Sequence, residues 1–324
     1  MLAVVCPGQG AQSPGMLAPW LELPSVADSI ARASRTTGLD LVAHGTTSDA
    51  DTIRDTAVAQ PLLVATALAS LRAVLELGAD DALDIAAHRV AGVTAGHSVG
   101  ELAAAAIAGV LTDDEALRLV TVRGSAMARA ASATPTGMSA VLGGDPDEVL
   151  AALAEHGLVA ANVNGGGQVV AAGTLAALAA FAAAPPAKVR VIALQVAGAF
   201  HTEHMAPAVA ELRAAADDVT PGEPMIPLLT NSDGTVAASG ARALELIVAQ
   251  VANPVRWDLC QATLLQLGVT GLLEVAPGGV LTGLARRTLP GVETVAVKTP
   301  ADLDAARDLV RRHAGTPQST QESS

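Results

Sequence analysis

The sequence predicts an α/β protein in which a parallel sheet is covered by helices on both faces and carries a smaller inserted subdomain. Short β-branched runs alternate with Ala- and Leu-rich stretches through most of the chain, which is the pattern of such a sheet. Between residues 138 and 196 the order changes to strand, helix, strand, strand, helix, strand. The 324 residues, 51% of them hydrophobic, are enough for one large domain or a domain with an insertion.

The strands of the main sheet are expected where short runs of apolar residues occur. These runs are Leu2–Cys6, Val90–Ala95, Ile226–Thr230, Leu272–Val275 and Thr294–Val297. Long helices are expected between them. Gln60-Pro61 predicts the start of one that ends near Leu77, because proline at the first helical position lacks an N–H that the helix does not use. Thr112 and Glu115 have the spacing of a capping box, which predicts the start of another.

The inserted segment is predicted to form a βαββαβ unit, the order that gives a small antiparallel sheet with two helices on one side. Its elements are expected at Met138–Leu142, Pro146–Glu155, Leu158–Val163, Gln168–Ala172, Thr174–Ala183 and Val189–Val196. The large domain would then consist of residues 1–134 and 198–313, with the subdomain at 135–197. Residues 314–324 show no apolar periodicity and are expected to form a disordered tail.

Charge and composition argue against a nucleic-acid-binding protein. Lys and Arg total 19 against 32 Asp and Glu, which gives a net charge of −13, and the chain has 2 Trp, 2 Phe and no Tyr. Nucleic-acid binders need a cationic surface and often use stacking rings. Cys6 and Cys260, the two cysteines, cannot form a disulfide framework or a four-ligand zinc site, so we expect a reducing cytoplasm.

A membrane protein is not expected either, although the mean hydropathy is +0.43. The N-terminus lacks the basic region and the long apolar stretch of a signal peptide. Residues 157–187 carry no charge, but asparagines, glycines and prolines leave only Val169–Ala184, which is shorter than the ~20 residues that a bilayer needs. Alanine, a weak hydrophobe, raises the average.

The sharpest chemical motif is GHSVGE at residues 96–101, which follows an apolar strand and precedes a helix-forming stretch. Serine on a tight strand-to-helix turn is typical of a nucleophile elbow. Small neighbours permit the strained backbone, and the helix N-terminus presents free N–H groups to the reacting oxygen. The motif therefore predicts Ser98 as a nucleophile. The alternative is a glycine-rich turn that only lets the helix approach the sheet.

A second glycine-rich loop, PGQGAQ at residues 7–12, follows the first predicted strand. Parallel sheets gather such loops at one edge, so we expect both loops to face one cleft. The backbone N–H groups of Gln9 and Val99 are then candidates for an oxyanion hole. A phosphate-binding loop or an ordinary turn is the alternative for this segment.

A serine nucleophile needs a base, and position selects His201 from the seven histidines. It ends the motif GAFH, where the chain returns from the inserted subdomain, and a base is expected in a cleft between domains. The side chain of His97 should point away from that of Ser98. A hydrogen-bonded structural histidine, or a metal pair with His204, are the alternatives. Because no third ligand is in sight, we expect no metal, and we also expect no cofactor.

Arg123 lies on the helix that Thr112 begins, three residues after Val120 and four before Met127 on the apolar face. We therefore expect its guanidinium to face partly inward. A buried guanidinium requires an anion, and its planar fork suits a carboxylate. That anion is either an internal Asp or Glu or the substrate.

Together these motifs resemble the malonyl-CoA:acyl carrier protein transacylases and the related acyltransferase domains of polyketide synthases, over about residues 1–313. The matching motifs are PGQGAQ (7–12), AQP (59–61), GHSVGE (96–101), Arg123 with Met127, NVNGGGQVV (162–170), GAFH (198–201) and Gln250 with NPV (253–255). The family implies an α/β-hydrolase-like large domain with a ferredoxin-like insert. This chain departs from it at Cys6, where an aromatic residue is frequent, and at Ala276, where glycine is usual.

The resemblance also implies a role for individual residues of this chain. They are the nucleophile Ser98 and the base His201, the oxyanion donors Gln9 and Val99, the substrate-binding Arg123, Met127, Phe200 and Asn162, and the histidine-orienting Gln250. The implied reaction is a ping-pong transfer of a malonyl group from malonyl-CoA, through a malonyl-serine, to the phosphopantetheine thiol of acyl carrier protein.

Two other functions remain open from the sequence. A serine hydrolase would need an acidic residue near His201 and would have no need of Arg123. An idle acyl-binding scaffold would not need Ser98. For the transacylase we expect a cytoplasmic monomer that serves fatty-acid or polyketide synthesis and binds neither membranes nor nucleic acid.

Specificity and docking give two further expectations. Phe200 predicts malonyl rather than methylmalonyl use, because related polyketide acyltransferases with phenylalanine at this place use malonyl and the ring fills the space of an extra methyl group. An acidic carrier protein needs a basic patch on this net-acidic chain. The candidates are Lys188, Arg190, Arg286 and Arg287, and ordinary surface charge is the alternative.

Overall fold

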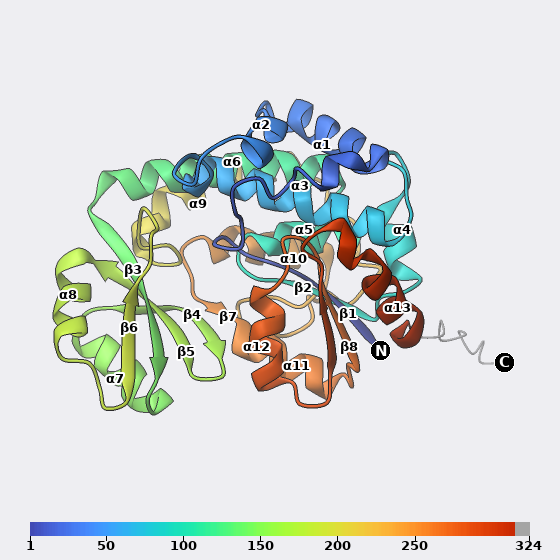
Figure 1. Cartoon of the computed structure of the whole chain (residues 1–324). Helices are drawn as coiled ribbons and strands as arrows, with labels where there is room; N and C mark the ends of the chain where they lie inside the picture. Colours follow the sequence, from blue (N-terminus) through green and yellow to red (C-terminus); the bar gives the residue numbers. More distant parts are fainter. Residues whose placement is uncertain (315–324) are drawn as a thin grey trace.

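The main sheet has four parallel strands in the order β2-β1-β8-β9 (Figure 1). They are β1 (Leu2–Cys6), β2 (Val93–Gly96), β8 (Gly271–Glu274) and β9 (Glu293–Ala296). The computed structural model describes residues 1–314, and it confirms the mixed α/β class. Strand β1 has the predicted bounds, and the other three begin or end within a few residues of the prediction.

Both faces of this sheet are buried, as the near-continuous apolar character of β1 requires. Leu2, Val4 and Cys6 belong to the larger core cluster, whereas Ala3 and Val5 belong to a second cluster on the opposite face. The first face is covered by α3 (Thr56–Val74), α5 (Gly100–Ile107) and α6 (Asp113–Ala133), and the second by α11 (Trp257–Gln266) and α12 (Val280–Thr288). The period-2 alternation of β1 therefore places the sheet between two helical layers.

The other helices of the large body surround these layers. They are α1 (Pro24–Thr37), α2 (Leu41–Thr46), α4 (Leu83–His88), α9 (Ala206–Ala216), α10 (Gly240–Gln250) and α13 (Leu303–His313), with short 3-10 helices at Trp20–Glu22, Thr52–Arg54, Glu203–Met205 and Pro300–Asp302. In Figure 1, α1, α3 and α6 form the upper helical layer.

Helix α3 begins one turn earlier than the predicted start at Gln60-Pro61 and ends before Leu77. The Asp55 side chain accepts a hydrogen bond from the N–H of Ala57 (2.9 Å) and caps the helix there, so Pro61 lies inside it. Within residues 1–314, α3 is the one helix long and apolar enough to cross a membrane, and 89% of its apolar window is buried inside the fold. It is the central core helix of the structure.

The capping box that begins α6 is confirmed. The Thr112 hydroxyl accepts from the N–H of Glu115 (3.2 Å), and the Glu115 carboxylate accepts from the N–H of Thr112 (2.8 Å). These two bonds fix the start of the helix that carries Arg123.

The predicted strand Ile226–Thr230 is wrong. This segment runs beside β2 but forms only two isolated bridges, a parallel one between Thr94 and Leu228 and an antiparallel one between Leu229 and Val236. Pro227 has no N–H to donate to a ladder, and the chain turns immediately after Thr230, so extended pairing cannot develop. The segment nevertheless brings Asn231 to the end of β2.

The inserted segment has the predicted order of elements. They are β3 (Thr136–Gly143), α7 (Pro146–Glu155), β4 (Val159–Gly165), β5 (Gln168–Thr174), α8 (Leu175–Ala183) and β6 (Val189–Ala193). Neighbouring strands pair antiparallel in the order β6-β3-β5-β4, over a separate apolar cluster that includes Val141, Leu153 and Phe181. Strand β6 ends before the predicted Val196.

The sequence did not predict the fifth strand of this second sheet. Strand β7 (Val255–Arg256) comes from the C-terminal part of the chain and pairs parallel with β4. It joins the insert to the large body close to Gln250, which ends α10. Of the predicted tail at residues 314–324, all but Ala314 lies outside the described residues.

Candidate active site

Ser98 lies in a tight turn between β2 and α5, with a left-handed φ of 53°. Two glycines permit this turn. A Cβ on Gly96 would lie 2.0 Å from the backbone of Gly100, and a Cβ on Gly100 would lie 2.3 Å from the backbone oxygen of Cys6. The strand-to-helix geometry that the motif predicts is therefore present, and it depends on residues without side chains.

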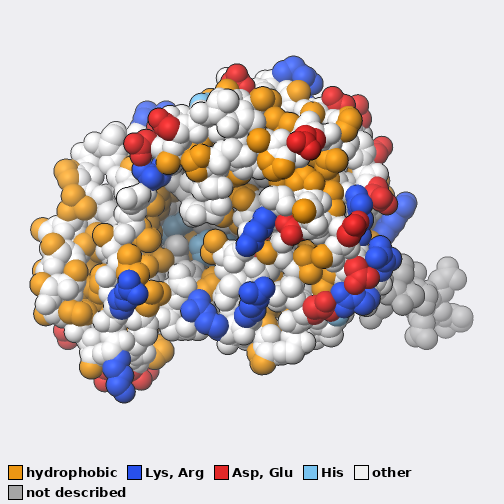
Figure 2. Space-filling model, in the orientation of Figure 1, with side chains coloured by type: hydrophobic (Ala, Val, Ile, Leu, Met, Phe, Trp, Pro, Cys, Tyr) orange, Lys and Arg blue, Asp and Glu red, His pale blue; other side chains and the backbone are white. Residues whose placement is uncertain are grey.

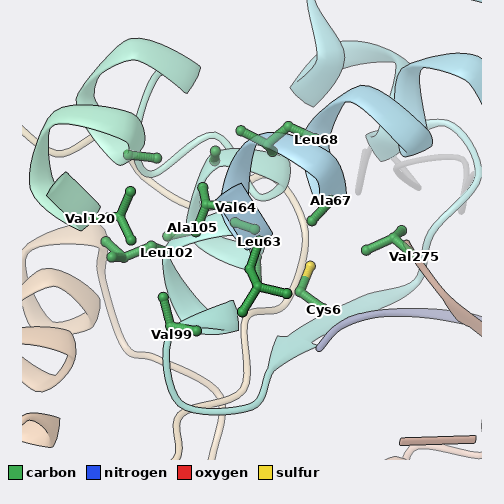
Figure 3. Packing of buried hydrophobic residues seen from close by; sticks show 14 of the residues in the cluster. Cys6, Leu63, Val64, Ala67, Leu68, Val99, Leu102, Ala105, Val120 and Val275 are labelled. Carbon is green, nitrogen blue, oxygen red and sulfur yellow. The ribbon is translucent and has the colours of Figure 1, made fainter. Parts of the chain in front are cut away.

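Val99 belongs to this turn through its backbone, and its side chain points into the core. Figure 3 shows it in the same cluster as Leu63 and Leu102, and it is buried. As the residue that precedes α5, Val99 sits where a helix has unused N–H groups.

The two glycine-rich loops are in contact, as expected. The N–H of His97 donates to the oxygen of Cys6 (3.0 Å), and a Cβ on Gly8 would lie 2.8 Å from the oxygen of His97. The side chain of Gln9 donates to the Thr56 hydroxyl (3.3 Å). Among the turn, loop and cap hydrogen bonds of residues 1–314, none uses the backbone N–H of Gln9 or Val99. The oxyanion role predicted for these two N–H groups therefore meets no competing acceptor among these bonds.

Ser98 and His201 form a hydrogen-bonded pair, with 2.7 Å between Oγ and Nε2. The other ring nitrogen, Nδ1, lies 2.8 Å from the backbone oxygen of Gln250. A carbonyl oxygen only accepts, so Nδ1 carries the proton and Nε2 is free to accept from the serine hydroxyl. Burial, and to a lesser degree the charge of Arg123, lower the pKa of His201 to about 3. The imidazole is therefore neutral and oriented as a base.

This arrangement leaves no ring nitrogen of His201 for a metal ion. Residues 1–314 contain no group of three or more His, Cys, Asp or Glu side chains that could hold one. His204 follows in a short 3-10 helix, and its backbone N–H bonds the hydroxyl of Thr202 (3.3 Å).

His97 points away from Ser98, toward the insert. Its Nε2 lies 2.9 Å from Oδ1 of Asn164 on β4, and its ring makes an edge contact with Trp257. Burial lowers the pKa of this imidazole as well. His97 therefore connects the serine turn to the second sheet, a contact that the sequence motif did not reveal.

Arg123 is fully buried beside Ser98, with 3.4 Å between Nη2 and Oγ. Its guanidinium donates to the side-chain oxygens of Gln60 (2.7 Å) and Gln250 (2.8 Å). No acidic side chain of residues 1–314 forms a salt bridge with it, and its Nε has no hydrogen-bond partner among them. Burial lowers the pKa of the guanidinium to about 10, although the charge of Glu101 opposes this. The internal ion pair left open by the sequence is not formed.

Two further polar residues behind Ser98 were not among the predicted site residues. Asn231 accepts the N–H of Ser98 on its side-chain oxygen (2.7 Å). Glu101 accepts the side-chain N–H of Gln250 (2.5 Å). Glu101 closes the GHSVGE motif, which is the one signal that pointed to it, whereas Asn231 stands in a stretch that reads as an ordinary turn.

The other residues predicted to bind substrate contact Ser98 and Arg123 less directly. The sulfur of Met127 lies 3.5 Å from Nε2 of Gln60, next to Arg123. Phe200 is buried immediately before His201. Asn162 lies on β4, and its Oδ1 is buried without a hydrogen-bond partner among the described residues. Within residues 1–314, no hydrogen bond joins Phe200 or Asn162 to the serine turn.

The site opens into a hollow between the large body and the insert, where Figure 2 shows histidine side chains at depth. A groove of about 530 Å³ is lined by Gln9, Arg54 and Leu194. Another of about 430 Å³ borders Gln250 and Arg256. Both volumes are within the range of small-molecule and cofactor sites.

Sequence comparison defines the class of this protein. The family model described as "Acyl transferase domain" matches residues 3–309. The chain therefore belongs to the acyl transferase family.

Within this family its relatives are malonyl CoA-acyl carrier protein transacylases. The one from Mycobacterium tuberculosis is 50% identical over 309 residues, which are 95% of this chain and all of the relative. The one from Salmonella typhimurium is 35% identical and covers 94% of this chain and 98% of its own.

Solved structures agree. The transacylase structure from Mycobacterium tuberculosis superposes with a TM-score of 0.89 at 50% identity, covering 95% of this chain and 99% of its own. A malonyl-transacylase in complex with its type II PKS acyl-carrier protein gives a TM-score of 0.85 at 33% identity, covering 95% and 99%.

Proposed function

We propose that this enzyme transfers the malonyl group of malonyl-CoA to the phosphopantetheine thiol of an acyl carrier protein. This is the activity in the names of relatives up to 50% identical over 95% of the chain. The observation that carries it is Arg123, a buried guanidinium beside Ser98 Oγ without an acidic partner among residues 1–314. Malonyl supplies the missing carboxylate, and its thioester carbon then lies next to the serine.

In the first half-reaction His201 Nε2 takes the proton of Ser98 as Oγ attacks the thioester carbonyl carbon. The developing oxyanion accepts from the backbone N–H groups of Gln9 and Val99. The carbon–sulfur bond then breaks, and the CoA sulfur leaves with the proton from His201. The product is a malonyl ester of Ser98.

In the second half-reaction the thiol of the carrier protein gives its proton to His201, and its sulfur attacks the ester carbonyl. The bond to Ser98 Oγ breaks, and this oxygen regains the proton. Because one thioester replaces another, the cycle is nearly balanced in free energy and its main demand is the exclusion of water. The carbonyl of Gln250 suits this scheme, since a carboxylate beside His201 would repel the malonyl group.

The other family positions complete the pocket in this proposal. Met127 and Phe200 contribute apolar surface to the acyl group. The unpartnered Oδ1 of Asn162 is assigned to a donor of the substrate, such as an amide N–H of the pantetheine arm. The four basic residues at 188, 190, 286 and 287 are exposed, which suits docking of an acidic carrier protein.

At the level of architecture we propose an α/β-hydrolase-like large domain (1–134 and 198–313) with a ferredoxin-like insert (135–197). The antiparallel order β6-β3-β5-β4 supports the second description. We also propose that the enzyme is a cytoplasmic monomer that binds neither membranes nor nucleic acid. Its net charge of −13 argues against binding to anionic nucleic acid.

The test is incubation with malonyl-CoA, followed by intact mass and by transfer to a holo carrier protein. A malonyl adduct that persists until the carrier protein is added supports the proposal. Rapid release of free malonate would indicate a serine hydrolase instead, and absence of any adduct would indicate a binding scaffold.

A further inference from the structure

We propose that Asn231 and Glu101 form a positioning pair behind the nucleophile. Asn231 holds the left-handed turn at Ser98, and Glu101 fixes the orientation of the Gln250 amide that faces Arg123. The inference rests on acyl transfer at Ser98, the function proposed above, and goes beyond it by assigning two residues that do not touch the reacting atoms.

Asn231 bonds the serine turn on both sides. Its Oδ1 accepts from the N–H of Ser98 (2.7 Å), and its Nδ2 donates to the oxygen of Gly96 (2.8 Å). Ser98 is not glycine, and a φ of 53° is unfavourable for any residue with a Cβ. Such a conformation persists only where its surroundings determine it. The two hydrogen bonds of the buried Asn231 amide fix the backbone of Ser98 in this conformation.

Glu101 holds Asn231 and Gln250 at the same time. One carboxylate oxygen accepts from the backbone N–H of Asn231 (2.6 Å), and the other accepts from the side-chain Nε2 of Gln250 (2.5 Å). Glu101 is buried on the first turn of α5, only three residues after Ser98. The short helix therefore ties a segment more than a hundred residues away to the serine turn.

The orientation of the Gln250 amide follows from its neighbours. Arg123 can only donate, so the amide oxygen must face Nη2, at 2.8 Å. The amide nitrogen then faces three acceptors: Glu101 at 2.5 Å, and the backbone oxygen of Ser98 and Oδ1 of Asn231, both at 3.1 Å. A residue at 101 that accepts on both oxygens thus keeps the acceptor of Gln250 on Arg123.

The two residues have separable consequences. Loss of Asn231 displaces the nucleophile and removes one of three acceptors around the Gln250 amide nitrogen. Glu101 and the Ser98 oxygen still hold that amide, so the bonds of Arg123 to Gln60 and Gln250 stay in place. Glu101→Gln presents an NH2 group in place of one acceptor. Because the backbone N–H of Asn231 cannot turn, the Gln250 amide must turn instead and direct its own NH2 at Arg123. The first change affects the rate of acylation, and the second affects binding of the malonyl carboxylate.

The kinetic experiment compares Asn231→Ala, Glu101→Gln and a control, Ser70→Ala. Ser70 is also buried and accepts a backbone N–H from a distant segment, that of Ala276 (3.0 Å), but it lies outside this network. Asn231→Ala should lower the single-turnover rate of Ser98 malonylation about 100-fold, with KM for malonyl-CoA changed less than about 3-fold. Glu101→Gln should lower the malonyl-over-acetyl preference about 10-fold or more. Ser70→Ala should change neither quantity.

A second experiment needs no activity. The loss of Tm caused by Asn231→Ala is measured in Ser98→Ala and in Ser98→Gly proteins. Glycine adopts a positive φ without the cost that alanine incurs, so the hydrogen bonds of Asn231 to the serine turn matter less in the Ser98→Gly protein. The loss should be smaller with glycine, by about 2 °C or more.

Equal Tm losses in both backgrounds would overturn the inference that Asn231 holds the turn at Ser98. So would an acylation rate in Asn231→Ala that is no lower than in Ser70→Ala. Equal falls in malonyl and acetyl transfer in Glu101→Gln would overturn the role of Glu101. If the wild-type enzyme forms no malonyl adduct, the proposed function fails, and the Tm comparison still decides whether Asn231 holds residue 98.

Discussion

Ser98 and His201 both have left-handed backbone conformations, with φ of 53° and 62°, and their side chains meet at 2.7 Å. Each costs on the order of 1–3 kcal/mol relative to a relaxed backbone. The two residues are 103 positions apart, and the insert lies between them. Strain on both sides of one hydrogen bond indicates that the fold is organised to keep this pair in contact.

We expect Ser98→Ala to abolish the acyl adduct and to lower turnover by as much as about 10⁶-fold, because the nucleophile is removed. His201→Ala should be nearly as damaging, since Ser98 then has no base. The two residues act as a unit, so the double variant should be little worse than either single one. Steady-state transfer rates and intact mass measure all three, and multiplicative losses would contradict a functional pair.

Arg123→Ala should lower malonyl transfer far more than acetyl transfer, because acetyl has no carboxylate to leave unpaired in the buried site. A charged hydrogen bond is worth about 1.5–3 kcal/mol, which corresponds to a loss of about 10- to 150-fold in the malonyl rate. The matched control is Arg118→Ala, an exposed arginine on the same helix, which should leave both rates unchanged. Equal falls in both rates for Arg123→Ala would make it a structural residue.

The pH dependence should reflect a neutral base. The pKa of His201 is lowered to about 3, chiefly by burial, so protonation of this imidazole should not lower the rate of Ser98 malonylation between pH 8 and about pH 5. The folded protein then binds fewer protons at this site than the unfolded chain between about pH 3 and 6.5. Its contribution to stability is therefore full above pH 6.5 and is lost as the pH falls toward 3. Rapid-quench mass spectrometry measures the malonylation rate at each pH. A rate that falls to half its maximum near pH 6.5 would disprove the neutral, low-pKa state of His201.

Phe200→Ser should raise methylmalonyl transfer relative to malonyl transfer. The ring is buried next to the base, and removing it opens the space for an extra methyl group that would otherwise cost roughly 1–3 kcal/mol, or about 5- to 150-fold. Competition between the two CoA esters measures the ratio, with Phe200→Leu as the control that keeps most of the apolar volume. An unchanged ratio would mean that Phe200 only fills the core, and a fall in Tm is expected in either case.

The order of elements and the chemical residues could be predicted from local sequence. A short apolar run identified β1, the Thr112–Glu115 spacing identified the start of α6, and glycines 96 and 100 identified a turn too tight for side chains. These features depend on residues within a few positions of one another. Where a local signal was overlooked, as with the cap at Asp55, the helix start was wrong by one turn.

The contacts between distant segments could not be predicted in this way. The strand β7 that extends the second sheet has two residues and no pattern of its own, and Pro227 broke up a segment whose composition suggested a strand. Asn231 reads as part of a turn, and its bonds to Ser98 exist only because that turn lies at the end of β2.

The sequence by itself determined the α/β class, the order of the elements in the insert, and the serine, histidine and arginine on which the proposed chemistry depends. Tertiary structure alone decided that Arg123 has glutamines rather than an acid as partners, that the backbone oxygen of Gln250 orients His201, and that Glu101 and Asn231 stand behind Ser98. The physical reason is the range of the interactions. Periodicity and capping act within one or two turns, whereas a buried polar group takes whichever partner the packed chain brings to it.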